Sequence, residues 1–249
     1  MMLPWIAASA AAGLTAGPRL RGSIFFRSVA PGEPPGRACP AGACDIGAAG
    51  HRWRALLPAT GRCPACRARI GPAALSVELT AGLALAAVAA RASSPWELAG
   101  LAWLVLLAVP LAFIDIAVRR LPDALTGAAF AGTAGFLAVA ALTGGHPGQL
   151  GRPVLARVVL AAVALCGFYL LLFLIRPSGM GLGDVKLAAS VGAALGWQGW
   201  GQVVAATFLA FTAAALYALG LVLFRRATRA TQFPLGPFMV LSALAVILA

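Results

Sequence analysis

The chain has 249 residues, of which 61% are hydrophobic and only 10% are charged, and its mean hydropathy is +0.91. Soluble domains normally carry about 25% charged residues, so this composition excludes a soluble globular protein and indicates a polytopic protein of the lipid bilayer. A net charge of +12 would suggest nucleic-acid binding in a soluble protein. Here the basic residues follow the membrane topology instead, so we expect no nucleic-acid partner.

Apolar stretches recur along the whole chain and predict an all-α fold. A helix needs about 20 apolar residues to cross a membrane, and five of the stretches are long enough or nearly so. We expect about eight transmembrane helices, with seven as the alternative. The stretches are Met1–Ala16, Ala73–Ala90, Glu97–Val118, Ala124–Thr143, Val154–Ile175, Val185–Trp197, Gln202–Phe224 and Phe233–Ala249.

The basic residues predict the orientation of these helices. If the helices alternate from an external N-terminus, 16 of the 19 Lys and Arg residues lie on the cytoplasmic side, as the positive-inside rule requires. The first stretch has no basic N-terminal region, so we interpret it as a retained span and not as a cleaved signal peptide. We therefore expect a multi-pass protein of the plasma (inner) membrane.

One hydrophilic segment divides the chain into three parts. We expect a first transmembrane segment at residues 1–17, a cytoplasmic Cys-rich insert at residues 18–72 and a membrane core at residues 73–249. The insert contains few aliphatic residues, and domains this small usually need a metal or disulfides to fold.

The cysteines of the insert form two pairs. Cys39 and Cys44 are separated by four residues, and Cys63 and Cys66 by two. Paired thiolates at such spacings are typical of a tetrahedral structural Zn²⁺ site. Disulfides are the alternative, but a cytoplasmic location would keep the thiols reduced.

Among the seven acidic residues, Asp115 and Asp184 indicate a functional site, because a carboxylate beside a hydrophobic span is costly. Asp115 follows an unbroken apolar run from Leu98 to Ile114, and its structural alternative is an ion pair with Arg119 one turn later. Asp184 lies in the glycine-dense segment Gly179–Leu187, and its structural alternative is a helix N-cap.

The expected topology brings Asp115 and Asp184 to the same leaflet. Two carboxylates in a poorly hydrated site share a proton, so that one can accept a proton from water while the other donates to a carbonyl. The glycines, including Gly181 and Gly183, suit a backbone that approaches a substrate strand closely. Asp123, after Pro122, is interpreted as structural, as the cap of the next helix.

The segments Phe113–Asp115, Leu121–Thr126 and Gly179–Leu187 together resemble the type IV prepilin leader peptidase family of GxGD-type intramembrane aspartyl proteases. The four-cysteine insert, Ser76–Thr80 and Phe233–Phe238 agree with this resemblance. Glu78 matches an acidic position of the family, without a role that its chemistry defines.

The resemblance implies cleavage of the basic leader of prepilins or pseudopilins after a glycine at the cytoplasmic face, with Asp115 and Asp184 as the catalytic pair. Many members then N-methylate the new N-terminus with S-adenosylmethionine. The insert departs from the family pattern, since Gly22–Val29 lacks the usual Asn and the first cysteine pair is spaced by four residues. The resemblance therefore implies the peptidase more strongly than the methyltransferase.

Two other classes of function fit the same residues. A proton- or cation-coupled transporter could use Asp115 and Asp184 as its ion site, although it would leave the insert and the glycine-dense turn unexplained. A non-catalytic assembly factor for pili or secretion is the other alternative, and the presence of both aspartates argues against it.

Overall fold

The computed structural model describes residues 3–29, 36, 39, 41, 57–63, 65–144, 151–177, 180–224 and 234–249. Within these ranges the chain forms eight α-helices and no β-strand, with one isolated bridge between Arg62 and Arg69. The helices are α1 (Leu3–Arg27), α2 (Ser76–Arg91), α3 (Pro95–Val118), α4 (Asp123–Leu142), α5 (Arg152–Ile175), α6 (Leu182–Gln198), α7 (Trp200–Leu223) and α8 (Gly236–Leu248).

This architecture confirms the all-α prediction, and only the first helix differs markedly from its expected extent. α1 passes through Pro18 and ends at Arg27, well beyond the apolar stretch. Its polar second half remains helical because one side of it is buried, including the charged Arg21. The carbonyl of Pro18 accepts a hydrogen bond from the amide of Leu57, which ties the insert to the helix.

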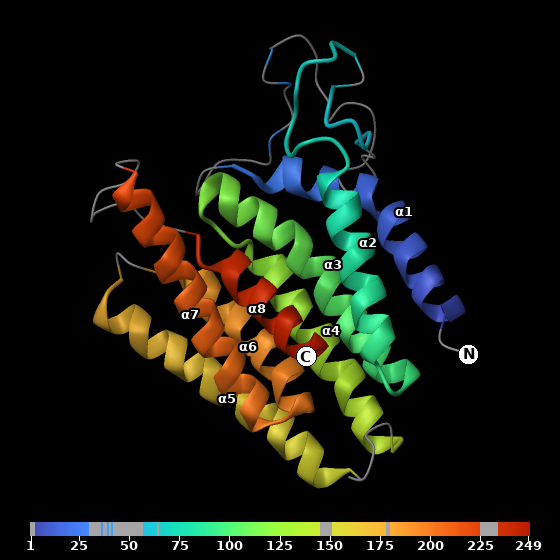
Figure 1. The fold of residues 1–249 in the computed structure, drawn as a ribbon, viewed down its shortest axis with the longest axis vertical. Coiled ribbons are helices and arrows are strands. Elements are labelled where there is room, and N and C mark those ends of the chain that lie inside the picture. Colours follow the sequence, from blue (N-terminus) through green and yellow to red (C-terminus); the bar gives the residue numbers. More distant parts are fainter. Residues whose placement is uncertain are drawn as a thin grey trace.

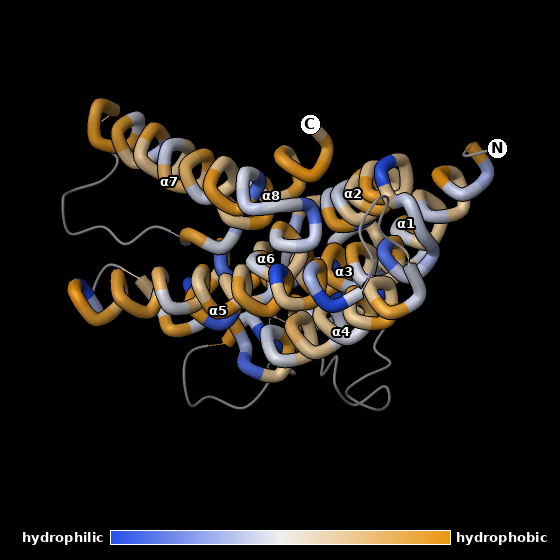
Figure 2. The backbone as a smooth tube through the Cα atoms, turned by 90° about the horizontal axis from the view of Figure 1, so that it is seen from below, coloured by the Kyte–Doolittle hydropathy of each residue, from blue (hydrophilic) through white to orange (hydrophobic). Residues whose placement is uncertain are grey.

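Four helices, α3, α4, α5 and α7, are long and apolar enough to cross a membrane. The chain is therefore an integral membrane protein. α5 and α7 lie at the edge of the bundle and are drawn largely in hydrophobic colours (Figure 2). Many of their large apolar side chains are exposed, as expected for helices that face lipid.

The part of the Cys-rich segment that the structure describes, chiefly residues 57–63 and 65–72, projects from one end of the bundle, beyond the end of α1 and the start of α2 (Figure 1). Successive helices run in opposite directions, so α3 ends at this end of the bundle and α4, α6 and α8 begin there. α6 occupies the centre, where it contacts α3, α4, α5, α7 and α8.

Close packing and an arginine side chain hold the C-terminal end of α6 against α5. A Cβ atom at Gly192 would lie 2.7 Å from the backbone oxygen of Ala161, so the two helices touch through their backbones. The Arg157 side chain donates to the carbonyls of Gly196 (2.7 Å) and Trp197 (2.9 Å). A guanidinium at this position also complements the negative end of the α6 dipole.

The same end of α6 is joined to the start of α3. The side-chain amide of Gln198 donates to Glu97 at 3.2 Å, and the other oxygen of Glu97 accepts from both the amide and the hydroxyl of Ser93. Glu97 is thereby satisfied by local partners while it links two helices.

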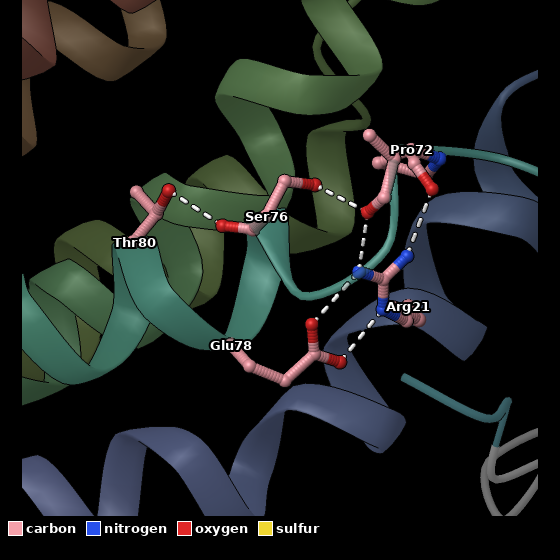
Figure 3. Close-up of polar contacts among 6 residues, drawn as sticks. Arg21, Pro72, Ser76, Glu78 and Thr80 are labelled. Atoms are coloured by element: carbon pink, nitrogen blue, oxygen red, sulfur yellow. Dashed lines mark hydrogen bonds and ion pairs between the residues drawn. The ribbon is translucent and has the colours of Figure 1, made fainter. Parts of the chain in front are cut away.

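A buried ion pair connects α1 to α2 (Figure 3). The guanidinium of Arg21 donates to both oxygens of Glu78, at 2.6 and 2.7 Å, and the two side chains are 2% and 3% exposed. Arg21 also donates to the carbonyls of Pro72 (2.9 Å) and Ala73 (2.7 Å) at the end of the insert. A side chain at Gly17 would collide with Glu78, so this glycine leaves the room that the pair needs. The pair gives Glu78 a structural partner that the sequence did not reveal.

Loss of one member of this pair should destabilise the fold strongly. We expect Glu78→Ala to lower the free energy of unfolding by about 3–5 kcal/mol, because it leaves the Arg21 charge buried without its counter-ion. Thermal unfolding of the purified protein in detergent measures the change. Lys186→Ala breaks the exposed Lys186–Asp123 pair and should change stability by about 1 kcal/mol or less. Equal effects of the two variants would contradict this view of Arg21 and Glu78.

Candidate active site

Asp115 lies near the end of α3, buried at 5% exposure. Its Oδ2 atom accepts a hydrogen bond of 3.1 Å from the backbone amide of Gly236, the first residue of α8. Arg119 does not pair with this carboxylate: it adopts a left-handed conformation (φ 52°) that ends α3, and only its backbone amide bonds to the carbonyl of Asp115. The alternative of an i,i+4 ion pair is therefore wrong.

Asp184 lies in the first turn of α6, buried at 6% exposure. It is the third residue of the helix and not the N-cap, which is Gly181. Its Oδ2 atom reaches back to accept a hydrogen bond of 3.1 Å from the Gly181 amide. Its Oδ1 atom is buried and has no hydrogen-bond partner among the residues that the structure describes.

The helices that carry the two carboxylates, α3 and α6, are in direct contact. Tyr169 of α5 belongs to the same buried core as Ile114 and Val185, which adjoin the two aspartates in the chain. Tyr169 is 1% exposed and packs against Phe211 of α7, with ring centroids 5.6 Å apart. Sequence reasoning missed this tyrosine, because a single aromatic residue in an apolar helix gives no signal of its own.

Both carboxylates are held in the same way. In each, a glycine amide binds Oδ2. Within the described ranges, Oδ1 of Asp184 is buried without a donor, and the Asp115 carboxylate accepts no hydrogen bond other than the one to Oδ2. A carboxylate fixed through one oxygen keeps the other oxygen for a proton or a water molecule. A pair of this kind can perform general acid–base chemistry on a polar bond.

Gly183 allows the first turn of α6 to approach the segment between α3 and α4. A Cβ atom at this position would clash with Leu121, since it would lie 2.6 Å from the Leu121 Cβ. A Cβ atom at Gly181 would lie 3.6 Å from Asp184 Oδ2, which is a normal van der Waals contact. Gly183 therefore has a packing role that the sequence did not predict. Gly179, the first glycine of the segment, lies outside the described residues.

Asp123, the first residue of α4, is exposed beside the site. Its carboxylate accepts a hydrogen bond of 2.7 Å from Lys186 of α6, and the two side chains are 76% and 48% exposed. This exposed pair joins the starts of α4 and α6. The prediction that Asp123 caps α4 is wrong, because the N-cap is Pro122 and no side-chain cap hydrogen bond forms there.

Three cysteines of the insert meet where it packs on α1. The Sγ atoms of Cys39, Cys63 and Cys66 lie within 4.8 Å of one another, and all three residues are free thiols. Phe26 of α1, together with Leu57 and Ile70, covers this cluster. The cluster could bind a metal ion, since three sulfur ligands at this separation suit a tetrahedral ion. Cys44, the fourth expected ligand, lies outside the described residues.

A side chain at position 183 should push α6 away from Leu121. We expect Gly183→Ala to destabilise the protein by about 1–3 kcal/mol, the usual effect of overpacking, because the clashing Leu121 Cβ cannot rotate away. Thermal unfolding in detergent measures this. The matched control is Gly127→Ala in α4, where no described atom outside the adjoining helix backbone lies within 4 Å of the added carbon. This variant should be at least as stable as the parent. A Gly183→Ala variant of parental stability would contradict the packing role.

Residues 98–219, which include Asp115 and Asp184, match the type IV leader peptidase family. Three similar proteins carry the name prepilin leader peptidase/N-methyltransferase. The Aeromonas salmonicida protein is 32% identical over 182 residues, covering 73% of this chain and 60% of its own length. The Stutzerimonas stutzeri protein is 31% identical over 193 residues, with coverages of 76% and 62%. The Pseudomonas aeruginosa protein is 27% identical over 185 residues, with coverages of 73% and 60%.

The matched regions thus span about 60% of the length of these relatives. No solved structure shows significant similarity to the chain.

Proposed function

The chain belongs to the type IV leader peptidase family, and from this membership we propose that it is a membrane aspartic endopeptidase that removes the basic leader of prepilins or pseudopilins after a glycine. The observation that carries the proposal is the pair of buried carboxylates, Asp115 and Asp184, each bound through one oxygen by a glycine amide. Both residues lie inside the matched segment.

The chemistry follows from two carboxyl groups that share one proton. The ionised carboxylate accepts a proton from water as the water oxygen bonds to the scissile carbonyl carbon, and the protonated carboxyl donates its proton to the carbonyl oxygen. When the C–N bond breaks, the first carboxyl returns its proton to the leaving nitrogen. The second carboxyl recovers a proton from the collapsing diol, so the pair regains its starting state.

In this proposal the site faces the cytoplasm, with the protein in the inner membrane. The excess of basic residues at the ends of the helices on the Asp115 side supports this orientation. Gly181 would contribute to substrate binding through its open surface, since among the described residues, its chain neighbours aside, the nearest atom to the position of its absent side chain is Asp184 Oδ2 at 3.6 Å. Gly183 would contribute by keeping this turn close to Leu121.

Removal of either carboxylate should abolish cleavage. We expect Asp115→Asn and Asp184→Asn to lower the rate of leader removal at least about 100-fold, while the protein remains in the membrane. Asp123→Asn, which alters the exposed carboxylate nearby, is the control that should retain cleavage.

The assay is co-expression with a type IV prepilin and mass spectrometry of its new N-terminus. The same spectrum reports whether the new N-terminus gains a methyl group, which would extend the proposal to methyl transfer from S-adenosylmethionine. Leader removal at the parental rate by either Asn variant would overturn the assignment. Loss of a proton or cation flux in place of cleavage would favour a transporter.

We also propose that the cysteine cluster holds a structural Zn²⁺. Cys39, Cys63 and Cys66 would supply three thiolates, and the sequence offers Cys44 as the fourth. The metal would hold the insert together next to Phe26 of α1, which covers the cluster. No step of peptide cleavage involves this site.

The purified protein should therefore contain about one equivalent of zinc. Cys63→Ser should lose the metal and lower the thermal midpoint, since it removes a ligand from a segment with little core of its own. Cys166→Ser is the matched control, because Cys166 lies on α5 outside the cluster. Elemental analysis measures the metal. Less than about half an equivalent, together with thiols that react freely in the folded protein, would contradict the zinc site.

A further inference from the structure

The start of α8 lies directly against Asp115. The Gly236 amide donates to Oδ2 from a position 121 residues further along the chain. A Cβ atom at Gly236 would lie 3.0, 3.5 and 3.7 Å from Oδ2, Cγ and Cβ of Asp115, and these are its three nearest atoms outside the local chain. Asp115 therefore occupies the space that the missing side chain of Gly236 leaves free.

α8 is firmly anchored, so this amide is a fixed donor. Met239, Val240 and Ala243 are buried at 2%, 8% and 3% exposure in the main core. Pro237 in the first turn favours the helical start. The positive end of the α8 dipole also points towards the carboxylate it binds.

The two carboxylates differ in the origin of their donors. Asp184 is held by Gly181, three residues earlier in its own turn, whereas Asp115 is held by a different helix. The orientation of Asp184 is thus set locally as α6 forms. The orientation of Asp115 depends on the docking of α8.

We propose that Gly236 is a positioning residue for Asp115: its N–H fixes Oδ2, so that Oδ1 is presented for proton transfer, and its missing side chain leaves room for the carboxylate. This inference rests on the proposed function, because positioning matters only if Asp115 takes part in cleavage. Gly236 lies in the segment Phe233–Phe238, which follows the matched residues 98–219 and agrees with the same family resemblance.

The test is Gly236→Ala in the full-length protein, assayed in detergent with a purified type IV prepilin. The added carbon would lie 3.0 Å from Oδ2, so the carboxylate must shift by a few tenths of an ångström, and this shift strains its hydrogen bond to the residue 236 amide. We expect kcat to fall at least about tenfold, the effect of weakening one hydrogen bond to a charged group. KM should stay within about twofold of the parental value, because a positioning residue acts on the chemical step and not on substrate binding.

A matched variant and a stability measurement separate positioning from folding. Gly127→Ala adds the same methyl group in open space on α4 and should leave both kinetic constants unchanged. The thermal midpoint of Gly236→Ala should stay near that of the parent. A parental kcat, or a fall in kcat matched by a lower thermal midpoint and a raised KM, would overturn the inference.

The parallel assay of Asp115→Asn shows which proposal has failed. If Asp115→Asn is inactive and Gly236→Ala has parental kinetics, only the positioning role is wrong. If Asp115→Asn cleaves normally, the proposed function itself is wrong.

Discussion

The arrangement of this protein depends on one constraint: a carboxylate buried in an apolar helix bundle needs a hydrogen-bond donor. Asp115 and Asp184 each accept a hydrogen bond through one oxygen from the backbone amide of a glycine, and neither forms an ion pair among the residues that the structure describes. A backbone amide has a fixed place on its helix, and the two amides lie at the starts of α6 and α8. The positions of the carboxylates are therefore ordered only if these two helices are firmly packed. Close packing among α3, α6 and α8 is therefore a requirement of the chemistry as well as of the fold.

α6 meets this requirement because it is fixed at both ends. At one end Gly183 packs against Leu121, and at the other Arg157 binds the last carbonyls while Gln198 binds Glu97. The helix is short compared with α5 and α7 and is buried on most sides. A central helix held in this way, in part by the lipid-facing α5, can carry a reactive group at its first turn.

Much of the fold could be predicted from the sequence, because apolar stretches and rare charges are strong signals in a membrane protein. The eight helices and the burial of Asp115 and Asp184 agree with those signals. The donors could not be predicted, since a backbone amide has no signature and the Gly236 amide is 121 residues from Asp115. We assigned Gly183 to the close approach of a substrate strand. Its contact with Leu121 could not be predicted, because it depends on how the first turn of α6 packs against the segment between α3 and α4. Arg21 was missed because an arginine after an apolar stretch resembles an ordinary topogenic charge.

The Arg21 side chain holds the end of the insert through the carbonyl oxygens of residues 72 and 73. Every amino acid presents such an oxygen, so this attachment recognises the course of the chain and is indifferent to which side chains stand there. A change of side chain at either of these two residues would therefore leave the attachment of the cysteine-bearing segment to the membrane helices in place.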